Sequence, residues 1–354
     1  MREPSFWWDE ASLASALLAP LAAIYGAVAR ARLGGHGRRA GAPVVCIGNF
    51  TVGGAGKTPA ALAVARMLAA VGEQPVFLSR GYGGTLAGPV RVDPARHRAQ
   101  DVGDEPLLLA RTAPTIVARD RVKGAGIAAG ASVIVMDDGF HNPSLAKDFS
   151  VLVVDARRGI GNGRVIPAGP LRAPLDAQLA RAHALVVVGT SSRAAAVAAA
   201  ARARNIPVLP ARLRPDAGFI AGLGGSRALA FAGIGDPEKF FLTLADAGVS
   251  VAATRSFPDH HRYTGAEARA LCEEADRAGL ALVATEKDLA RLGGDDEARE
   301  LAAHARALPV RLAFEDEERF KSLLLERLAA ARTRGRGAQR VRGVFTHQAQ
   351  MKTR

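Results

Sequence analysis

The residues best suited to chemistry form one short segment, Gly53-Gly54-Ala55-Gly56-Lys57-Thr58. Glycines let backbone N–H groups turn toward phosphate oxygens, and the start of a helix adds partial positive charge. A lysine there can reach the β- and γ-phosphates of a nucleotide, and a threonine hydroxyl can bind Mg²⁺. The loop is therefore expected to bind nucleotide phosphates through Thr51, Val52, Gly53, Gly54, Ala55, Gly56, Lys57 and Thr58.

The flanking segments support this interpretation. An apolar run at residues 44–47 precedes the loop, and a helical pattern at about residues 59–70 follows it. Strand, glycine loop and helix is the order of a phosphate-binding P-loop. The strict pattern has a small residue where Thr51 stands, so the loop is closer to an xGGxGKT variant. The alternative is a chance glycine turn, which the flanking strand and helix disfavour.

Two neighbouring acids are candidate metal ligands. An apolar run at residues 132–136 ends in Asp137 and Asp138, followed by Gly139. An acid at this strand end in a P-loop fold lies near the nucleotide's metal, although Asp-Gly is also a common turn. We expect Thr58 together with Asp137 and Asp138 to form the metal site.

Several further polar groups lie at predicted element ends. Asp104 and Glu105 precede a proline at the start of a helical stretch, where acids are ordinary caps. Arginines follow two predicted strands and can hold anionic oxygens or merely flank loops. They are Arg80, Arg119 and Arg121. An Asp-His-His run at residues 259–261 can be a metal site or an acid–base group. Residues 285–288 form one more polar cluster after a strand.

The elements that must position these residues alternate between β-rich and helical runs. Continuous Val/Ile strands with helical crossovers predict an α/β fold: a P-loop NTPase-like parallel sheet with helices on both faces. Strands are expected at residues 44–47, 76–79, 115–118, 133–136, 151–154, 185–188 and 208–213. A glycine-rich linker at residues 222–227 then predicts a smaller C-terminal α/β domain with strands near 228–232, 249–254, 280–284 and 310–314.

This pattern divides the chain into four parts. They are an N-terminal membrane-associating helix (residues 1–40), the P-loop core (41–221), the smaller α/β domain (222–330) and a basic tail (331–354). The tail holds seven Lys or Arg and no acid, and its composition predicts disorder. It is either a solvated end or a contact for anionic lipid or RNA.

Composition excludes several other classes. The 354 residues are 49% hydrophobic, so the chain can bury a substantial core despite its net charge of +13. Its two cysteines form no ligand spacing and no disulfide framework, which fits a reducing compartment. No internal period indicates a solenoid.

The N-terminal stretch has the composition of a helix at a membrane surface. Phe6, Trp7 and Trp8 precede an Ala/Leu-rich run at about residues 11–29, and four arginines follow by residue 39. The leader is too acidic for a secretory signal, and Ser15 and Pro20 interrupt the run, which disfavours a membrane span. An interfacial helix is favoured over a helix packed only on the protein.

Nine segments in this order resemble tetraacyldisaccharide 4′-kinase, the lipid A kinase of Gram-negative bacteria. They cover about residues 4–328 and read IGNFTVGGAGKTP, SRGYGG, VGDEP, ARDR, MDDGF, GNGRVIPAGPLR, FAGIGDPEKF, FPDHHRY and ATEKD. The resemblance implies a monotopic enzyme on the cytoplasmic face of the inner membrane. It would use ATP and Mg²⁺ to phosphorylate the 4′-hydroxyl of an acylated disaccharide 1-phosphate lipid. No nucleic acid and no obligate protein partner are expected.

The resemblance also assigns roles to residues. It places the catalytic acid on Asp104 and its histidine partner on His260, with His261 as the nearest alternative. It places the metal-site acids on Asp137 and Asp138. We expect Asp104, oriented by His260 or sharing a proton with it, to accept the hydroxyl proton. The γ-phosphate or the lipid's 1-phosphate would be held by Arg80, Arg119, Arg121 and Arg172.

Two segments depart from the family pattern. Where many members read DDGFQH, this chain has His141 and Asn142 after Phe140. Where many read LREP, it has Leu171-Arg172-Ala173-Pro174, so a glutamate near the metal is absent. The alternative function is a nucleotide-switched dimeric ATPase or GTPase that acts through protein partners. Such proteins usually carry an additional lysine where Val52 stands.

Overall fold

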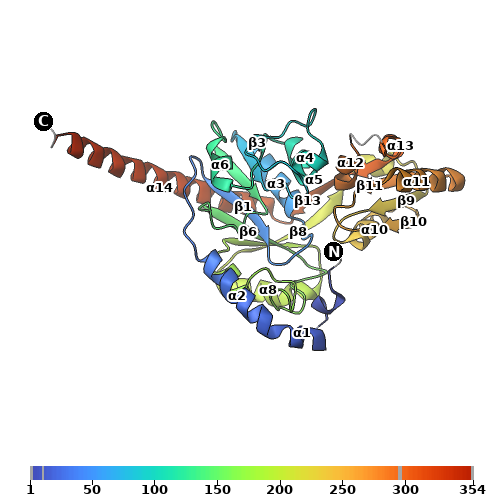
Figure 1. Ribbon diagram of the computed structural model, residues 1–354, viewed down its shortest axis with the longest axis horizontal. Helices are drawn as coiled ribbons and strands as arrows, with labels where there is room; N and C mark the ends of the chain where they lie inside the picture. Colours follow the sequence, from blue (N-terminus) through green and yellow to red (C-terminus); the bar gives the residue numbers. More distant parts are fainter. Residues whose placement is uncertain (1–2, 10–11, 294–296, 352–354) are drawn as a thin grey trace.

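Two β-sheets organise residues 3–9, 12–293 and 297–351, which are the residues described by this computed structural model (Figure 1). The larger sheet has nine strands in the order β13-β8-β7-β6-β1-β5-β2-β4-β3. Its strands are β1 Val44–Asn49, β2 Pro75–Ser79, β3 Val90–Arg91, β4 Thr115–Val117, β5 Val133–Asp137, β6 Phe149–Asp155, β7 Ala184–Val188, β8 Val208–Pro215 and β13 Val310–Phe314.

The centre of this sheet is parallel, as the apolar strand runs predicted. β1 is buried along its whole length and pairs parallel with β5 on one side and β6 on the other. Helices cover both faces, because the strands are apolar on both sides. One face packs against α3 Lys57–Ala70 and the start of α14 Glu317–Met351, and the other against α2 Ala19–Leu33, α7 Leu175–Leu179 and α8 Ala195–Arg202.

Both edges of the larger sheet differ from the prediction. β3, which the sequence did not reveal, pairs antiparallel with β4. β13, expected in the C-terminal domain, pairs antiparallel with β8 and so completes the first sheet. The chain thus returns to the first unit after building the second. A strand's apolar pattern identifies the strand but not its partner, which explains this misplacement.

The second unit lies beside the first and is built on a four-stranded parallel sheet in the order β10-β9-β11-β12. Its strands are β9 Ala228–Ala232, β10 Val251–Ser256, β11 Ala281–Thr285 and β12 Arg306–Leu308. α10 Pro237–Asp246 covers one face, and α11 Gly265–Ala278 and α13 Arg299–His304 the other. α12 Glu286–Leu292 follows β11 directly and contacts α5 Asp104–Ala110 of the first unit. The remaining short helices are η1 Ser5–Trp7, α1 Leu13–Leu17, α4 Ala99–Val102, α6 Arg121–Gly126, η2 Ser192–Ala194 and α9 Ala217–Ala221.

The N-terminal helices α1 and α2 lie along the outside of the first unit (Figure 1). Their exposed face carries a row of large apolar side chains, Leu13, Leu17, Leu21, Ile24, Tyr25 and Val28. The two tryptophans instead pack onto the protein. Trp7 donates its indole N–H to the Pro167 carbonyl at 2.9 Å, and Arg158 lies over the Trp8 ring. Residues of the Ala/Leu-rich run, rather than the two tryptophans, therefore form the exposed apolar row. Within the described part of the chain, every helix is too short or too polar to span a bilayer.

The final helix differs from the predicted tail. α14 continues from Glu317 to Met351, so a helix occupies most of the segment expected to be disordered, and the last three residues lie outside the described part. Its distal part extends away from the body of the molecule (Figure 1). Arg, Ala and Gln are good helix formers, and a helix already docked through Phe320 and Leu324 needs no new nucleus to continue.

Candidate active site

The P-loop lies between the end of β1 and the start of α3, at the centre of the larger sheet. Gly53 and Gly56 adopt φ values of 88° and 89°, which the loop requires and which other residues rarely adopt. The Lys57 ammonium is 3.2 Å from Asn49 Oδ1 and 3.4 Å from the Gly53 carbonyl. Asn49 also donates to the Thr51 carbonyl at 2.8 Å, so it braces the loop from within. Sequence reasoning missed Asn49, although its place at the end of β1 was a signal.

Thr58 and Asp137 form a site whose chemistry fits a divalent cation. Thr58 Oγ1 is 3.3 Å from Asp137 Oδ2, and the other Asp137 oxygen is buried without a hydrogen-bond partner. Burial, with the nearby charges of Glu105 and Asp138, raises the pKa of Asp137 to about 7. A cation would remove this penalty. Among the described residues, no three or more His, Cys, Asp or Glu side chains are arranged so that they could hold a metal ion by themselves. Phosphate oxygens and water would therefore supply the other ligands of Mg²⁺.

Asp138 is engaged differently from its neighbour. Its φ is 51°, and the turn brings one carboxylate oxygen within 2.8 Å of Arg172 NH1 and the other within 3.8 Å of Lys57 Nζ. Burial opposes its ionised form, but the charges of Lys57 and Arg172 outweigh it and hold the pKa of Asp138 well below its usual range. Asp137 thus keeps one oxygen without a partner among the described residues, whereas Arg172 and Lys57 lie against the two oxygens of Asp138.

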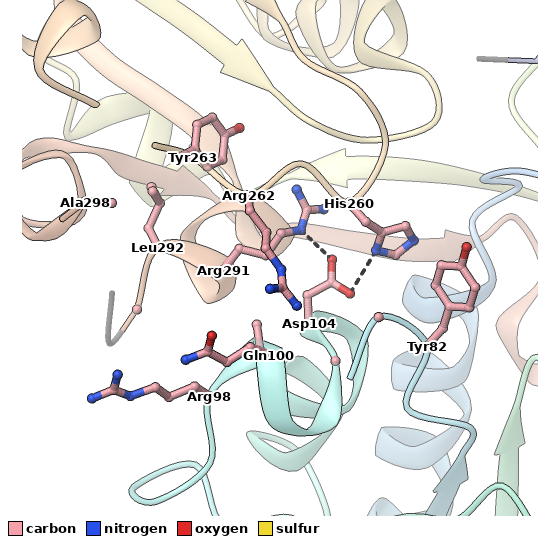
Figure 2. A pocket seen from close by; sticks show the side chains of 14 residues that line it. Tyr82, Arg98, Gln100, Asp104, His260, Arg262, Tyr263, Arg291, Leu292 and Ala298 are labelled. Atoms are coloured by element: carbon pink, nitrogen blue, oxygen red, sulfur yellow. Dashed lines mark hydrogen bonds and ion pairs between the residues drawn. The ribbon is translucent and has the colours of Figure 1, made fainter. Parts of the chain in front are cut away.

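The structure brings Asp104 and His260 together across the two units. Asp104 is the first residue of α5 and is almost fully buried, and its Oδ1 is 3.3 Å from His260 Nδ1. His260 has a φ of 56°, which turns its ring toward the first unit (Figure 2). His261 points to a different partner: its Nε2 is 3.0 Å from Glu267 and its ring stacks on Phe257.

The two groups shift each other's protonation. Burial disfavours the Asp104 carboxylate, but the hydrogen bond from His260 and the charges of Arg291 and Lys287 lower its pKa below the usual range. Burial likewise disfavours the imidazolium, but the hydrogen bond and charge of Asp104 raise the pKa of His260 above its usual value. The pair is thus set up to hold a proton on the imidazole.

Two cations from α12 complete this centre, and neither was predicted to have a role. Lys287 Nζ is 2.5 Å from Glu105 Oε1, and Arg291 Nε is 2.8 Å from Asp104 Oδ2. The sequence pattern indicates only a polar cluster at residues 285–288, after a strand. Arg291 lies four residues after Lys287 on a helix, where the two side chains share a face, and this spacing was the available signal.

A large cavity connects these parts. It has a volume of about 820 Å³ and extends from Tyr25 and Val28 on α2, past Lys57 and Thr58, to His260. The four arginines suggested by the sequence all line it: Arg80, Arg119, Arg121 and Arg172. A smaller cavity lies beside it, and Asp104 and Arg291 line that one (Figure 2). His260 lines both cavities, so it stands between the P-loop side and the buried carboxylate.

The arginines differ in what they can contribute. Arg80 and Arg119 are exposed, and Arg172 is half-buried against Asp138. Arg121 is 2% exposed and donates to the Ala118 carbonyl, while its Nε has no partner among the described residues. Guanidinium groups of this kind bind phosphate oxygens through paired N–H groups.

A P-loop with a buried acid beside its threonine lines a cavity that His260 of the Asp104–His260 pair also lines. This arrangement defines a nucleotide-dependent phosphotransferase of the P-loop class. Comparison with known proteins narrows this class. The family of tetraacyldisaccharide-1-P 4′-kinase, LpxK, matches residues 14–329. A tetraacyldisaccharide 4′-kinase of Rhodopseudomonas palustris is 56% identical over 94% of this chain and 98% of its own. A tetraacyldisaccharide 4′-kinase of Nitrobacter winogradskyi is 55% identical over 94% of this chain and 99% of its own.

A solved structure agrees. The crystal structure of LpxK from Aquifex aeolicus in complex with ATP covers 89% of this chain and 99% of its own, with 26% identity and a TM-score of 0.69. The chain belongs to the tetraacyldisaccharide 4′-kinase family.

Proposed function

We propose that this protein transfers the γ-phosphate of ATP to the 4′-hydroxyl of tetraacyldisaccharide 1-phosphate, which gives the 1,4′-bisphosphate lipid. Family membership supports the activity. The observation that carries the site assignment is the Asp104–His260 pair, joined at 3.3 Å from two separate units beside the P-loop cavity.

The P-loop would hold the nucleotide. Lys57 is now paired with Asn49 and Gly53, and exchanging these neutral acceptors for phosphate oxygens is favourable for an ammonium. Thr58 and Asp137 would hold Mg²⁺, which supplies charge neutralisation for the transferred phosphoryl group. Asp138 keeps Lys57 and Arg172 directed at the same place. Phosphoryl transfer depends mainly on such positioning and charge.

The Asp104–His260 pair would remove the acceptor proton. As the 4′-oxygen bonds to the γ-phosphorus, the bond from that phosphorus to the β–γ bridging oxygen breaks and ADP leaves. The hydroxyl proton passes to the pair. His260 Nδ1 faces Asp104, and the imidazolium that forms is stabilised by the buried carboxylate, in the manner of other Asp–His pairs.

The four arginines would hold anionic oxygens. Arg172 is fixed beside Asp138 next to the P-loop and is suited to the γ-phosphate. Arg80, Arg119 and Arg121 line the same cavity from the ends of β2 and β4 and are suited to the γ-phosphate or the lipid's 1-phosphate.

The lipid would approach from a membrane surface. Leu13, Leu17 and Ile24 are 78%, 72% and 66% exposed on the α1–α2 face, and Tyr25 and Val28 on the same helix line the large cavity. A helix inserted in the interface would therefore place acyl chains and headgroup beside the P-loop. We infer peripheral attachment to the cytoplasmic face of the inner membrane, where ATP is available.

The test is direct transfer. Purified protein is incubated with γ-labelled ATP, Mg²⁺ and tetraacyldisaccharide 1-phosphate in detergent. Label should move to the lipid with wild type and with the control Asp93→Ala, which removes an exposed carboxylate that pairs with Arg96. Asp104→Ala should lose transfer while binding ATP. Release of phosphate to water without lipid labelling would contradict the proposal and favour a nucleotide-switched ATPase.

A further inference from the structure

We propose that Arg291 is a positioning residue for the phosphoryl transfer: it holds the Asp104 carboxylate in the orientation in which the Asp104–His260 pair accepts the proton. This inference rests on the function proposed above. Arg291 Nε lies 2.8 Å from Asp104 Oδ2, and both side chains are almost fully buried. Figure 2 shows Asp104 held between Arg291 and His260, one on each carboxylate oxygen.

One peptide group fixes both partners of Asp104. The Gly233 carbonyl accepts a hydrogen bond from the His260 backbone N–H at 3.1 Å and another from Arg291 NH1 at 2.8 Å. The Gly233 N–H donates to Asp288 Oδ1 at 2.9 Å. Because Arg291 and the His260 backbone share the Gly233 carbonyl as an acceptor, a displacement of Gly233 moves both of them.

A buried carboxylate locks the other side of the guanidinium. Asp288 is 0% exposed, and its Oδ1 accepts from Arg291 NH1 and from the Tyr263 hydroxyl, each at 2.8 Å. Thr285 Oγ1 donates to the second oxygen at 2.6 Å. A guanidinium with this many fixed contacts loses little conformational freedom when Asp104 binds it, which is the condition for precise orientation.

The contact also joins the two units. Asp104 comes from α5 of the first unit, and Arg291 and His260 come from the second. With Oδ1 taken by the Glu105 N–H at 2.9 Å and by His260, the Arg291 bond to Oδ2 removes the remaining rotation of the carboxylate. The proton acceptor is thus assembled only when the second unit is seated on the first.

The geometry requires an arginine. Nε serves Asp104 while NH1 serves Gly233 and Asp288, so one planar group spans acceptors on both units. A lysine ammonium is a single point and cannot occupy both places. Arg291→Lys keeps the positive charge but loses the planar set of N–H donors. This variant therefore separates the orientation of the Asp104 carboxylate from the effect of the charge on it.

The experiment compares Arg291→Ala and Arg291→Lys with Asp104→Ala, the Asp104→Ala/Arg291→Ala double variant and a matched control. The control is Arg157→Ala, which removes another ion pair between the units, 3.3 Å from Asp236, and leaves Asp104 untouched. The kcat and KM for ATP are measured in single and multiple turnovers, together with melting temperature. Guanidinium is added to the alanine variants, since Arg291 lines the smaller cavity and its truncation would enlarge that space.

Arg291→Ala should lower kcat by about 10²-fold, the usual cost of a misplaced catalytic group, with KM for ATP little changed. Arg291→Lys should recover only part of this loss. Guanidinium should raise the kcat of Arg291→Ala and not that of the double variant, which should be no slower than Asp104→Ala because the two residues act as a unit.

Other outcomes would overturn the inference or its premise. If Arg291→Ala matches Arg157→Ala, or if its loss multiplies with that of Asp104→Ala, Arg291 is a structural ion pair. If Arg291→Ala fails to fold, a fully active Arg291→Lys would equally overturn the inference. If Asp104→Ala itself keeps wild-type kcat, the proposed role of Asp104 fails, and the position of Arg291 no longer bears on catalysis.

Discussion

A single methyl group added at Gly233 should slow the reaction without weakening nucleotide binding. A Cβ at this position would lie 3.0 Å from His261 Cβ, 3.1 Å from Arg291 NH1 and 3.1 Å from the Pro258 carbonyl. Each of these distances is tighter than ordinary contact, so the neighbours must move by a few tenths of an ångström. Since Gly233 carries the hydrogen bonds of both His260 and Arg291, that movement displaces both partners of Asp104.

The size of the effect follows from this geometry. Overpacking a buried site costs about 1–3 kcal/mol, which a folded protein of this size can tolerate. Misplacing a proton acceptor by a fraction of an ångström to an ångström costs up to about 10²-fold in rate. We therefore expect Gly233→Ala to fold and to lose about 10- to 10²-fold in kcat, with KM for ATP near that of wild type.

The assay is steady-state lipid phosphorylation at saturating ATP, with melting temperature recorded beside it. Gly126→Ala is the matched control, because a Cβ there meets nothing within 4 Å. A Gly233→Ala protein with wild-type kcat and an unchanged melting temperature would refute the reasoning, since the second unit would then have absorbed the methyl group without moving His260 or Arg291. Loss confined to KM for ATP would refute it as well.

Four further predictions concern pH, metal, stability and membrane binding. Asp104 raises the pKa of His260 above the usual 6.5, and the imidazole must be neutral to accept a proton, so kcat should decrease as the pH falls through this raised pKa. Asp104→Asn should move this acidic limb of the pH profile to lower pH, and an acidic limb that stays in place would contradict the prediction. Asp137→Asn should raise the Mg²⁺ concentration for half-maximal activity, as titration with Mg²⁺ at fixed ATP would measure, because it replaces the unpartnered acid beside Thr58. Phe320→Ala should lower the free energy of unfolding by about 3–5 kcal/mol in urea titrations, since this ring is fully buried and stacks on Phe314; a cost below about 1 kcal/mol would mean that α14 does not anchor the sheet. Leu17→Gln combined with Ile24→Gln should reduce binding to anionic vesicles at least tenfold without changing the melting temperature, because burial of each side chain in a membrane contributes about 1.5–3 kcal/mol. Leu242→Gln, at an exposed leucine of the second unit, should leave vesicle binding unchanged.

The sequence was sufficient where function is local in the chain. The P-loop, from Gly53 to Thr58, is one turn between one strand and one helix, so its residue types are sufficient to predict its shape. The phosphate contacts of its residues stay a prediction. The order of apolar runs likewise predicted that the centre of the larger sheet is parallel. It did not predict the strand order, in which β1 lies between β5 and β6. Asp104 and His260 came from the family resemblance, because a cap and a loop histidine have no local signal that joins them.

The sequence failed where contacts connect distant segments. Arg291 and Asp104 are 187 positions apart, and only the docking of α12 on α5 makes them partners. β13 was assigned to the wrong unit because its pairing with β8 is long-range. The contacts of Asp138 with Arg172 and Lys57 depend on a turn with positive φ, which the sequence does not predict. The division of the chain into four domains stays a prediction.

The central claim is that Asp104 and His260 act as one proton acceptor assembled across the two units. The most direct measurement is single-turnover lipid phosphorylation by Asp104→Ala, His260→Ala and the double variant, at saturating ATP and Mg²⁺. We predict that the double variant is no slower than the slower single variant, because removing either member already disables the pair. A double variant slower by the product of the two single losses would mean that the residues act independently, and would contradict the account.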